Sequence, residues 1–356
     1  MENEKATMSV CAGVVIIGRN EGLRLERCLT SIARQDVKTV YVDSGSTDGS
    51  VETARRHGAT VVELDTTIPF CAARARNAGY QQLLSADPQP DYVQFIDGDC
   101  EIIDDWLQVA ARSLHSRPDL AIVTGWLHEK HPEKSIYNRL GDLEWNAGGA
   151  GEVDAVGGIF MIRREAFDSV GGFDPTVAAG EEPELCQRLI RKGWRLAKLD
   201  HDMAWHDLAM TRFGQWWRRM VRSGYSSLDV GRRFGIVKYV RNNWRVRIWT
   251  AWFLLLMLVS GIAADTGSMV VLWTAVLLLA LWPVRCLRIA VRVWRRGQPL
   301  WVAAAYAGLM TIAFLPQIIG QILYCSDRLR RRSFRLVEYK SPLPSRGKAR
   351  HFTHEP

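Results

Sequence analysis

The stretch YVQFIDGD at residues 92–99 runs from an apolar segment directly into two carboxylates. Its aromatic and β-branched residues, 92–96, predict a buried strand. Asp97 and Asp99 stand two positions apart, so on an extended backbone both side chains would point the same way. Two such carboxylates can hold one hard divalent cation together with the diphosphate of a nucleotide. A turn or a helix cap is the alternative for so short a motif.

Apolar segments alternate with helix-like segments around this stretch. Strands are expected at residues 13–17, 39–42, 60–64 and 92–96, and helices at 23–33, 50–57, 72–85 and 105–116. This alternation is typical of an α/β domain with a mostly parallel sheet. Ligands bind such sheets beyond the carboxyl ends of the strands. The segments to inspect are therefore 18–21, 43–48 and 97–99.

Charged side chains follow two of the expected strands. Asp43 stands at the tip of the second strand, where it could meet a nucleotide base or ribose, whereas Asp48 is better placed to cap the following helix. Arg76, in the helix before the fourth strand, could pair with a diphosphate. A position on the helix surface is the alternative for Arg76.

Taken in order, these segments resemble glycosyltransferase family 2, whose catalytic domain has the GT-A fold. The matching motifs are VIIGRNE at 15–21, DSGSTD at 43–48, RARNAG at 74–79, DGD at 97–99, GGIFMIRR at 157–164, VGGFD at 170–174 and GEEPELCQRL at 180–189. Each motif alone is a weak signal, but the ordered set is specific.

The resemblance implies an inverting transfer of a sugar from a nucleotide-diphosphate donor, with Mn²⁺ or Mg²⁺ as cofactor. It assigns Asp43 to the donor base, Glu21 to the base or ribose, and Arg76 to the diphosphate. It assigns Asp97 and Asp99 to the metal and the donor.

The resemblance also places a general base at Glu182, where relatives usually carry Asp. Either carboxylate can accept a proton from an acceptor hydroxyl. The longer Glu side chain leaves Glu181 and Glu184 open as alternatives. Glu184 has a structural alternative as well, an i,i+4 pair with Arg188.

Further residues match motifs near the metal and the acceptor. The resemblance places His206 beside the metal, although a lone His is more often structural, and it places Gly157, Gly158 and Glu184 on the acceptor side. 

Gln215 and Arg218 are assigned to the acceptor side by a looser resemblance, to the QxxRW motif of processive polysaccharide synthases. Arg219 stands where that motif has Trp, and the chain has few apolar runs. These departures favour a non-processive transferase that adds one sugar.

Charge divides the chain into two parts. Residues 1–211 carry 22 Lys and Arg against 33 Asp and Glu, a net charge of −11, whereas residues 212–356 carry 24 against 5, a net charge of +19. The basic residues flank apolar runs, which favours a membrane surface over nucleic acid as the partner. Interleaved Trp and Arg in residues 212–247 predict amphipathic helices at the membrane interface, with a solvated basic helix as the alternative.

Three uncharged apolar runs follow, at residues 248–264, 266–284 and 297–326. The first two are close to the roughly 20 residues of a spanning helix and predict a helical hairpin. Flanking arginines place both of its ends, and the catalytic domain, in the cytoplasm at the inner membrane. The third run contains Pro316 and Gly320. If it spans, the basic tail lies outside, so a re-entrant or interfacial segment stays open.

The expected organisation is an N-terminal tail (1–11), a GT-A domain (12–211), interface helices (212–247), a transmembrane or re-entrant region (248–326) and a basic cytoplasmic tail (327–356). Seven Cys without CxxC spacing argue against a disulfide framework and a Cys-rich zinc site. The start MENEKATMSV lacks the pattern of a secretory signal.

The predicted function is sugar transfer to a membrane-associated, lipid-linked acceptor in glycan or polysaccharide synthesis. One alternative is a synthase that transfers the sugar onto polyprenyl phosphate itself. Another is a nucleotidyltransferase, which would need a Gly-rich loop with Lys where residues 18–21 read GRNE. A non-catalytic membrane scaffold is the third alternative, and it would not need the carboxylates at 181, 182 and 184.

Overall fold

The computed structural model describes residues 11–35, 37–85, 89–177 and 179–330. Apart from Cys11 and residues 327–330, the two predicted tails lie outside these ranges.

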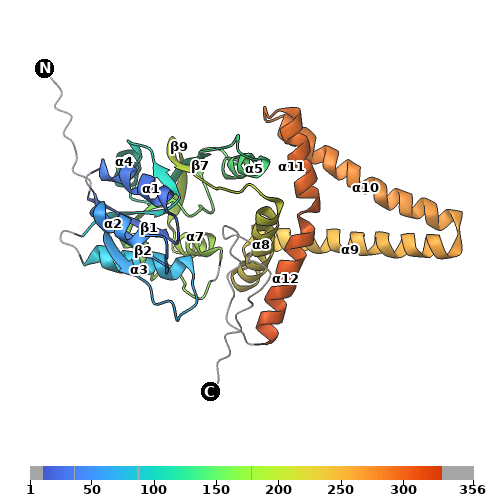
Figure 1. Cartoon of the computed structure of the whole chain (residues 1–356), viewed down its shortest axis with the longest axis horizontal. Coiled ribbons are helices and arrows are strands. Elements are labelled where there is room, and N and C mark those ends of the chain that lie inside the picture. The colour runs from blue at the N-terminus through green and yellow to red at the C-terminus, as the bar shows by residue number, and fades with distance from the viewer. Residues whose placement is uncertain (1–10, 36, 86–88, 178, 331–356) are drawn as a thin grey trace.

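An α/β domain forms the first part of the chain (Figure 1). Its strands are β1 (Ala12–Gly18), β2 (Lys38–Asp43), β3 (Thr60–Glu63), β4 (Tyr92–Asp97), β5 (Cys100–Ile102), β6 (Leu120–Glu129), β7 (Gly151–Glu152), β8 (Phe160–Arg163) and β9 (Arg195–His206). Its helices are α1 (Leu23–Ala33), α2 (Ser50–Arg56), α3 (Ala72–Leu84), α4 (Trp106–Ser116), α5 (Ile136–Trp145), α6 (Arg164–Ser169) and α7 (Glu181–Arg191). The strands and helices predicted between residues 13 and 116 are confirmed, with small shifts at their ends.

The sheet has the order β3-β2-β1-β4-β8-β6-β9-β5, and β7 pairs with β9. Strands β3, β2, β1 and β4 are parallel, whereas β8 runs antiparallel to both β4 and β6. The predicted mostly parallel α/β sheet is thus confirmed, with antiparallel strands in its second half. Parallel pairing sets Gly18 opposite Asp43 and Ile17 opposite Asp97, so the carboxyl ends of β1, β2 and β4 meet at one edge.

Helices cover both faces of this sheet, because its central strands are apolar on both sides. In β1, Val14 and Ile16 join the core beneath α1 and α4, while Val15 joins the core beneath α3 and α7. Buried cores on both faces leave the strand ends as the place where polar side chains can gather.

The second part of the chain is helical: α8 (Phe213–Phe234), α9 (Val237–Thr266), α10 (Met269–Trp294), α11 (Leu300–Ile312) and α12 (Phe314–Leu329). Helices α9 and α10 reverse at Gly267 and form the predicted hairpin, which extends away from the α/β domain (Figure 1). The Trp252 indole donates to the Leu278 carbonyl at 3.1 Å across it. Residues 237–247, predicted as part of a separate interface region, continue into the hairpin because no proline interrupts α9.

Among the described residues, three helical segments are long and apolar enough to cross a membrane: Val237–Thr266, Met269–Trp294 and Leu300–Leu329. In the first two segments only 11% and 6% of the apolar stretch is buried within the protein, whereas 39% is buried in the third. The third segment breaks at Ala313, not at Pro316, because Pro316 lies in the first turn of α12, where proline is tolerated. Helices α11 and α12 lie across the base of the hairpin (Figure 1).

Helix α8 connects the α/β domain to the helices that follow and packs against α12. Trp216, expected at the membrane interface, is buried with Met220 against Leu208 and Met210. An indole gains more from this apolar core than from the bilayer surface, since the core removes nearly all of it from water. The interfacial interpretation is therefore wrong for Trp216.

The crossing of α8 and α12 is expected to tolerate no side chain at Gly320. A Cβ there would lie 2.0 Å from the Val221 carbonyl oxygen, so Gly320→Ala should destabilise the protein by about 1–3 kcal/mol. Gly308→Ala, in α11, is the control, because a Cβ at Gly308 meets nothing within 4 Å. Thermal unfolding in detergent measures both. Equal unfolding temperatures for the two variants would contradict this close crossing.

Candidate active site

A cavity of about 920 Å³ opens between the carboxyl edge of the sheet and helices α7, α8 and α9. Eight of the predicted site residues line it: Glu21, Arg76, Asp97, Asp99, Gly157, Gly158, Glu181 and Glu182. The other five are absent from its lining: Asp43, Glu184, His206, Gln215 and Arg218. Most of the predicted site residues therefore share one cavity.

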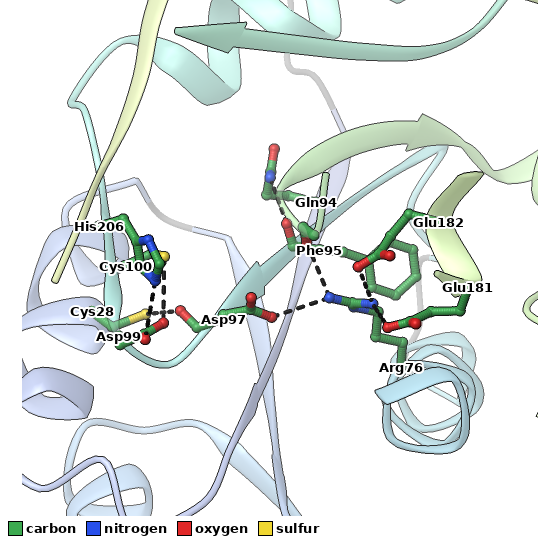
Figure 2. Close-up of polar contacts among 11 residues, drawn as sticks. Cys28, Arg76, Gln94, Phe95, Asp97, Asp99, Cys100, Glu181, Glu182 and His206 are labelled. Carbon is green, nitrogen blue, oxygen red and sulfur yellow. Dashed lines mark hydrogen bonds and ion pairs between the residues drawn. The ribbon is translucent and has the colours of Figure 1, made fainter. Parts of the chain in front are cut away.

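Arg76 of α3 lies at the centre of the cluster and is only 2% exposed (Figure 2). Its Nη1 donates to Glu181 Oε1 and Glu182 Oε1, each at 2.9 Å, and its Nη2 donates to Asp97 Oδ1 at 3.1 Å. Three carboxylates thus surround the guanidinium that the sequence assigned to a diphosphate. In this arrangement Arg76 binds the carboxylates, because a buried cation needs paired charge.

Glu181 and Glu182 occupy the first turn of α7, where the helix dipole favours negative charge. The Glu182 side chain is 15% exposed and that of Glu181 is 5% exposed, so Glu182 is the more accessible of these two neighbours. Burial, and then the neighbouring charge of Glu181, raises the pKa of Glu182. A carboxylate with a raised pKa is a stronger base when it is ionised.

Gly158 lets the backbone pass beside this cluster. A Cβ at Gly158 would lie 2.7 Å from Arg76 Nη2 and 3.0 Å from Asp97 Oδ2, whereas one at Gly157 would meet nothing within 4 Å. We expect Gly158→Ala to displace Arg76 and Glu182 and to lower turnover by about 10²-fold, the scale of a small misplacement. Gly157→Ala should leave turnover nearly unchanged. Steady-state rates of the two variants measure the difference, and similar rates would exclude this packing role.

Asp97 and Asp99 point in different directions (Figure 2). Asp97 faces Arg76, while Asp99 Oδ2 lies 3.1 Å from His206 Nε2. The expectation that both carboxylates face one way is wrong, because Gly98 and Asp99 form a turn between β4 and β5 instead of an extended segment.

The candidate metal ligands are therefore Asp99, Cys100 and His206, whose ligand atoms lie within 4.8 Å of one another. A carboxylate oxygen and an imidazole nitrogen are ligands that Mn²⁺ accepts. The buried Nδ1 of His206 has no hydrogen-bond partner among the described residues. This donor set fits a divalent cation. Cys100 was not predicted, although it directly follows the DGD motif.

Asp43, at the end of β2, forms hydrogen bonds within its own strand and the loop that follows. Its carboxylate accepts hydrogen bonds from the Tyr41 hydroxyl at 3.0 Å and from the amides of Gly45 and Ser46 at 2.8 and 2.9 Å. Asp43 is 3% exposed, so its contacts favour shaping the loop over the predicted contact to a base. Glu21 lines the cavity and pairs with Arg24 at 2.8 Å.

Glu184 does not take its predicted place on the acceptor side. It is 1% exposed, and its Oε2 accepts from Arg188 Nη2 at 2.7 Å, which is the i,i+4 pair that the sequence left open. Glu184 is absent from the cavity lining, and the carbonyl of Val170 also accepts from its partner Arg188.

Gln215 and Arg218, predicted on the acceptor side, do not line the cavity either. The Gln215 side chain caps α8 by accepting from the Thr211 and Arg212 amides. The face of α8 towards the cavity carries Arg219, Arg222, Ser223 and Ser226 instead. Their spacing of i, i+3, i+4 and i+7 is one helix face, and Arg218 falls outside it.

Comparisons with known proteins agree with this architecture. The model of glycosyl transferase family 2 matches residues 13–171, and that of the N-terminal domain of galactosyltransferase matches residues 151–212. The succinoglycan biosynthesis protein ExoA of Rhizobium meliloti (strain 1021) is 28% identical over 188 residues, which are 49% of this chain and 56% of ExoA. The chain thus spans little more than half the length of this curated relative.

Among solved structures, the mannosyltransferase PcManGT of Pyrobaculum calidifontis, in complex with GDP-Man and Mn²⁺, is similar in fold. It has a TM-score of 0.59 and 20% identity, covering 89% of this chain and 88% of that one. The family model covers six of the eight predicted residues in the cavity, and Glu181 and Glu182 follow its last matched residue. Together with the shared fold, these matches support a glycosyltransferase of family 2 with a GT-A-like fold.

Proposed function

We propose that this glycosyltransferase carries out an inverting, metal-dependent transfer of a sugar from a nucleotide-diphosphate donor to a lipid-linked acceptor in polysaccharide synthesis. The observation that carries the proposal is the shared cavity, in which Arg76 holds both Glu182 and Asp97 and whose lining also includes Asp99. The name of the relative ExoA, a succinoglycan biosynthesis protein, supports the polysaccharide.

The chemistry needs one base and one site for the leaving group. Glu182 takes the proton of the acceptor hydroxyl while that oxygen attacks the anomeric carbon, and the nucleoside diphosphate leaves from the opposite side. A single displacement inverts the anomeric centre. Arg76 keeps Glu182 ionised and oriented through the 2.9 Å contact.

Asp99 and His206, with Cys100 as the third candidate ligand, would hold Mn²⁺ or Mg²⁺, which would supply positive charge to the departing diphosphate. Asp99 lines the cavity, whereas His206 lies behind it beside the Trp145 ring, with 4.6 Å between ring centroids. His206 would thus orient the Asp99 carboxylate as well as bind the cation.

The membrane arrangement completes the proposal. We place the hairpin of α9 and α10 across the inner membrane and α11–α12 in its surface, with the catalytic domain in the cytoplasm. The low burial of the hairpin and the packing of α12 against α8 support this arrangement. A reporter fused after residue 330 should lie on the cytoplasmic side. A periplasmic reporter would indicate a third span.

Thermal unfolding of the detergent-solubilised protein with a panel of nucleotide sugars, with and without Mn²⁺, tests the donor. Tight binding raises apparent stability by mass action, so one donor should do so only with metal. Donor hydrolysis or transfer under the same conditions separates an enzyme from a non-catalytic scaffold. A donor that binds without any turnover, in the presence of membrane lipid extracts, would favour the scaffold.

A further inference from the structure

The helical part of the chain supplies one wall of the cavity. Helix α8 contributes Arg219, Arg222, Ser223 and Ser226, and the first turn of α9 contributes Lys238 and Tyr239. Three cations and three hydroxyls therefore face a cavity whose other side carries Asp97, Asp99, Glu181 and Glu182. The mechanism above uses none of these α8 and α9 residues.

Among the described residues, Arg219 is the one cation of the three that forms an ion pair. Arg219 Nη1 pairs with Glu144 Oε2 at 3.0 Å. Within the described ranges, Arg222 and Lys238 form no ion pair or side-chain hydrogen bond. Arg222 is half-buried, and a guanidinium removed from water in this way favours an anionic partner.

The position of this wall relates it to the membrane. Lys238 lies at the start of α9, and the uncharged run of the same unbroken helix begins at Ile248. At 1.5 Å per residue, the two are separated by about 15 Å along the helix axis. An anion held at Arg222 and Lys238 would thus lie between the hairpin and the carboxylates of α7.

We propose that Arg222 and Lys238, supported by Arg219, bind the phosphate or diphosphate group of a lipid-linked acceptor. The inference rests on the proposed function, and it deepens it by locating the acceptor's charged group. Guanidinium groups suit phosphate oxygens because their donors match them in pairs. The nucleotide diphosphate of the donor has the same chemistry, but the candidate metal ligands place it at the strand edge near Asp99.

Farnesyl diphosphate is the probe for this subsite. Farnesol is its uncharged control, and UDP or GDP with Mn²⁺ tests the donor site separately. Binding is measured on the full-length protein in detergent. Arg222→Gln should weaken farnesyl diphosphate about 10- to 100-fold, the loss expected for a charge-assisted hydrogen bond, and leave the nucleotide unchanged. Arg222→Lys should restore part of the affinity. Arg232→Gln is the control, because Arg232 is exposed on α8 outside the cavity lining.

Each result has a separate meaning. Equal binding of farnesol and farnesyl diphosphate, or no effect of Arg222→Gln, would overturn the phosphate subsite. Equal weakening of the nucleotide would assign Arg222 to the donor and also overturn it. Arg222-dependent binding of farnesyl diphosphate in a protein that transfers no sugar would uphold the subsite while the proposed function fails.

Discussion

Replacing Glu182 by Gln should lower turnover by about 10²–10⁴-fold, the usual contribution of a general base. An acceptor hydroxyl is a poor nucleophile at neutral pH, and Glu182 is more accessible than Glu181, its neighbour on α7. The amide oxygen of Gln can still accept the hydrogen bond from Arg76, so the fold and the donor site should persist. Single-turnover rates, with donor affinity measured in parallel, test the prediction.

Glu184→Gln is the comparison on the same helix. It weakens the pair with Arg188, so the unfolding temperature should fall while the folded protein keeps most of its turnover. Near-normal turnover in Glu182→Gln together with a large loss in Glu184→Gln would show that the base is Glu184.

The pH dependence of turnover should follow the ionisation of Glu182. Burial and the charge of Glu181 raise its pKa, and only the ionised form accepts a proton. Turnover should therefore fall, as the pH is lowered, at a higher pH than an exposed Glu would give. In Glu182→Gln this acid limb should disappear from the residual rate. An unchanged limb in the variant would assign the titration to another group.

Asp99→Asn should abolish metal-dependent donor binding and cost about 10²–10³-fold in turnover. The Asp99 carboxylate lies 3.1 Å from His206 and lines the cavity, and the amide of Asn is a far weaker ligand. Metal stabilisation of a leaving group is worth several kcal/mol, which sets this scale. Calorimetric titration of Mn²⁺ and donor measures binding, and the exposed Asp104→Asn is the control.

His206→Ala should reproduce the loss if the imidazole is a ligand or orients Asp99. Unchanged Mn²⁺-dependent donor binding in Asp99→Asn would place the metal elsewhere, with Asp97 as the nearest carboxylate of the same motif. The two single variants and the double variant would also show whether the residues act as a unit, because coupled residues are not additive.

The sequence alone was enough to predict a mostly parallel sheet, the positions of its first four strands and the hairpin. These depend on local patterns: apolar runs such as residues 13–17 are buried on both faces wherever they lie, and the runs at 248–264 and 266–284 are too apolar for water. The motif order also identified eight residues of the cavity, because parallel strands bring their carboxyl ends to one edge.

Only the tertiary structure decided how those residues are used. Arg76 meets Glu181 and Glu182 more than 100 positions further along the chain, and no local pattern encodes that contact. A turn at Gly98 and Asp99 separates two carboxylates that strand geometry would align, and it brings Asp99 to His206 and Cys100. On α8, the direction in which the helix packs selected Arg222 over Arg218, since helix periodicity fixes which residues share a face but packing against α12 fixes which face meets the cavity.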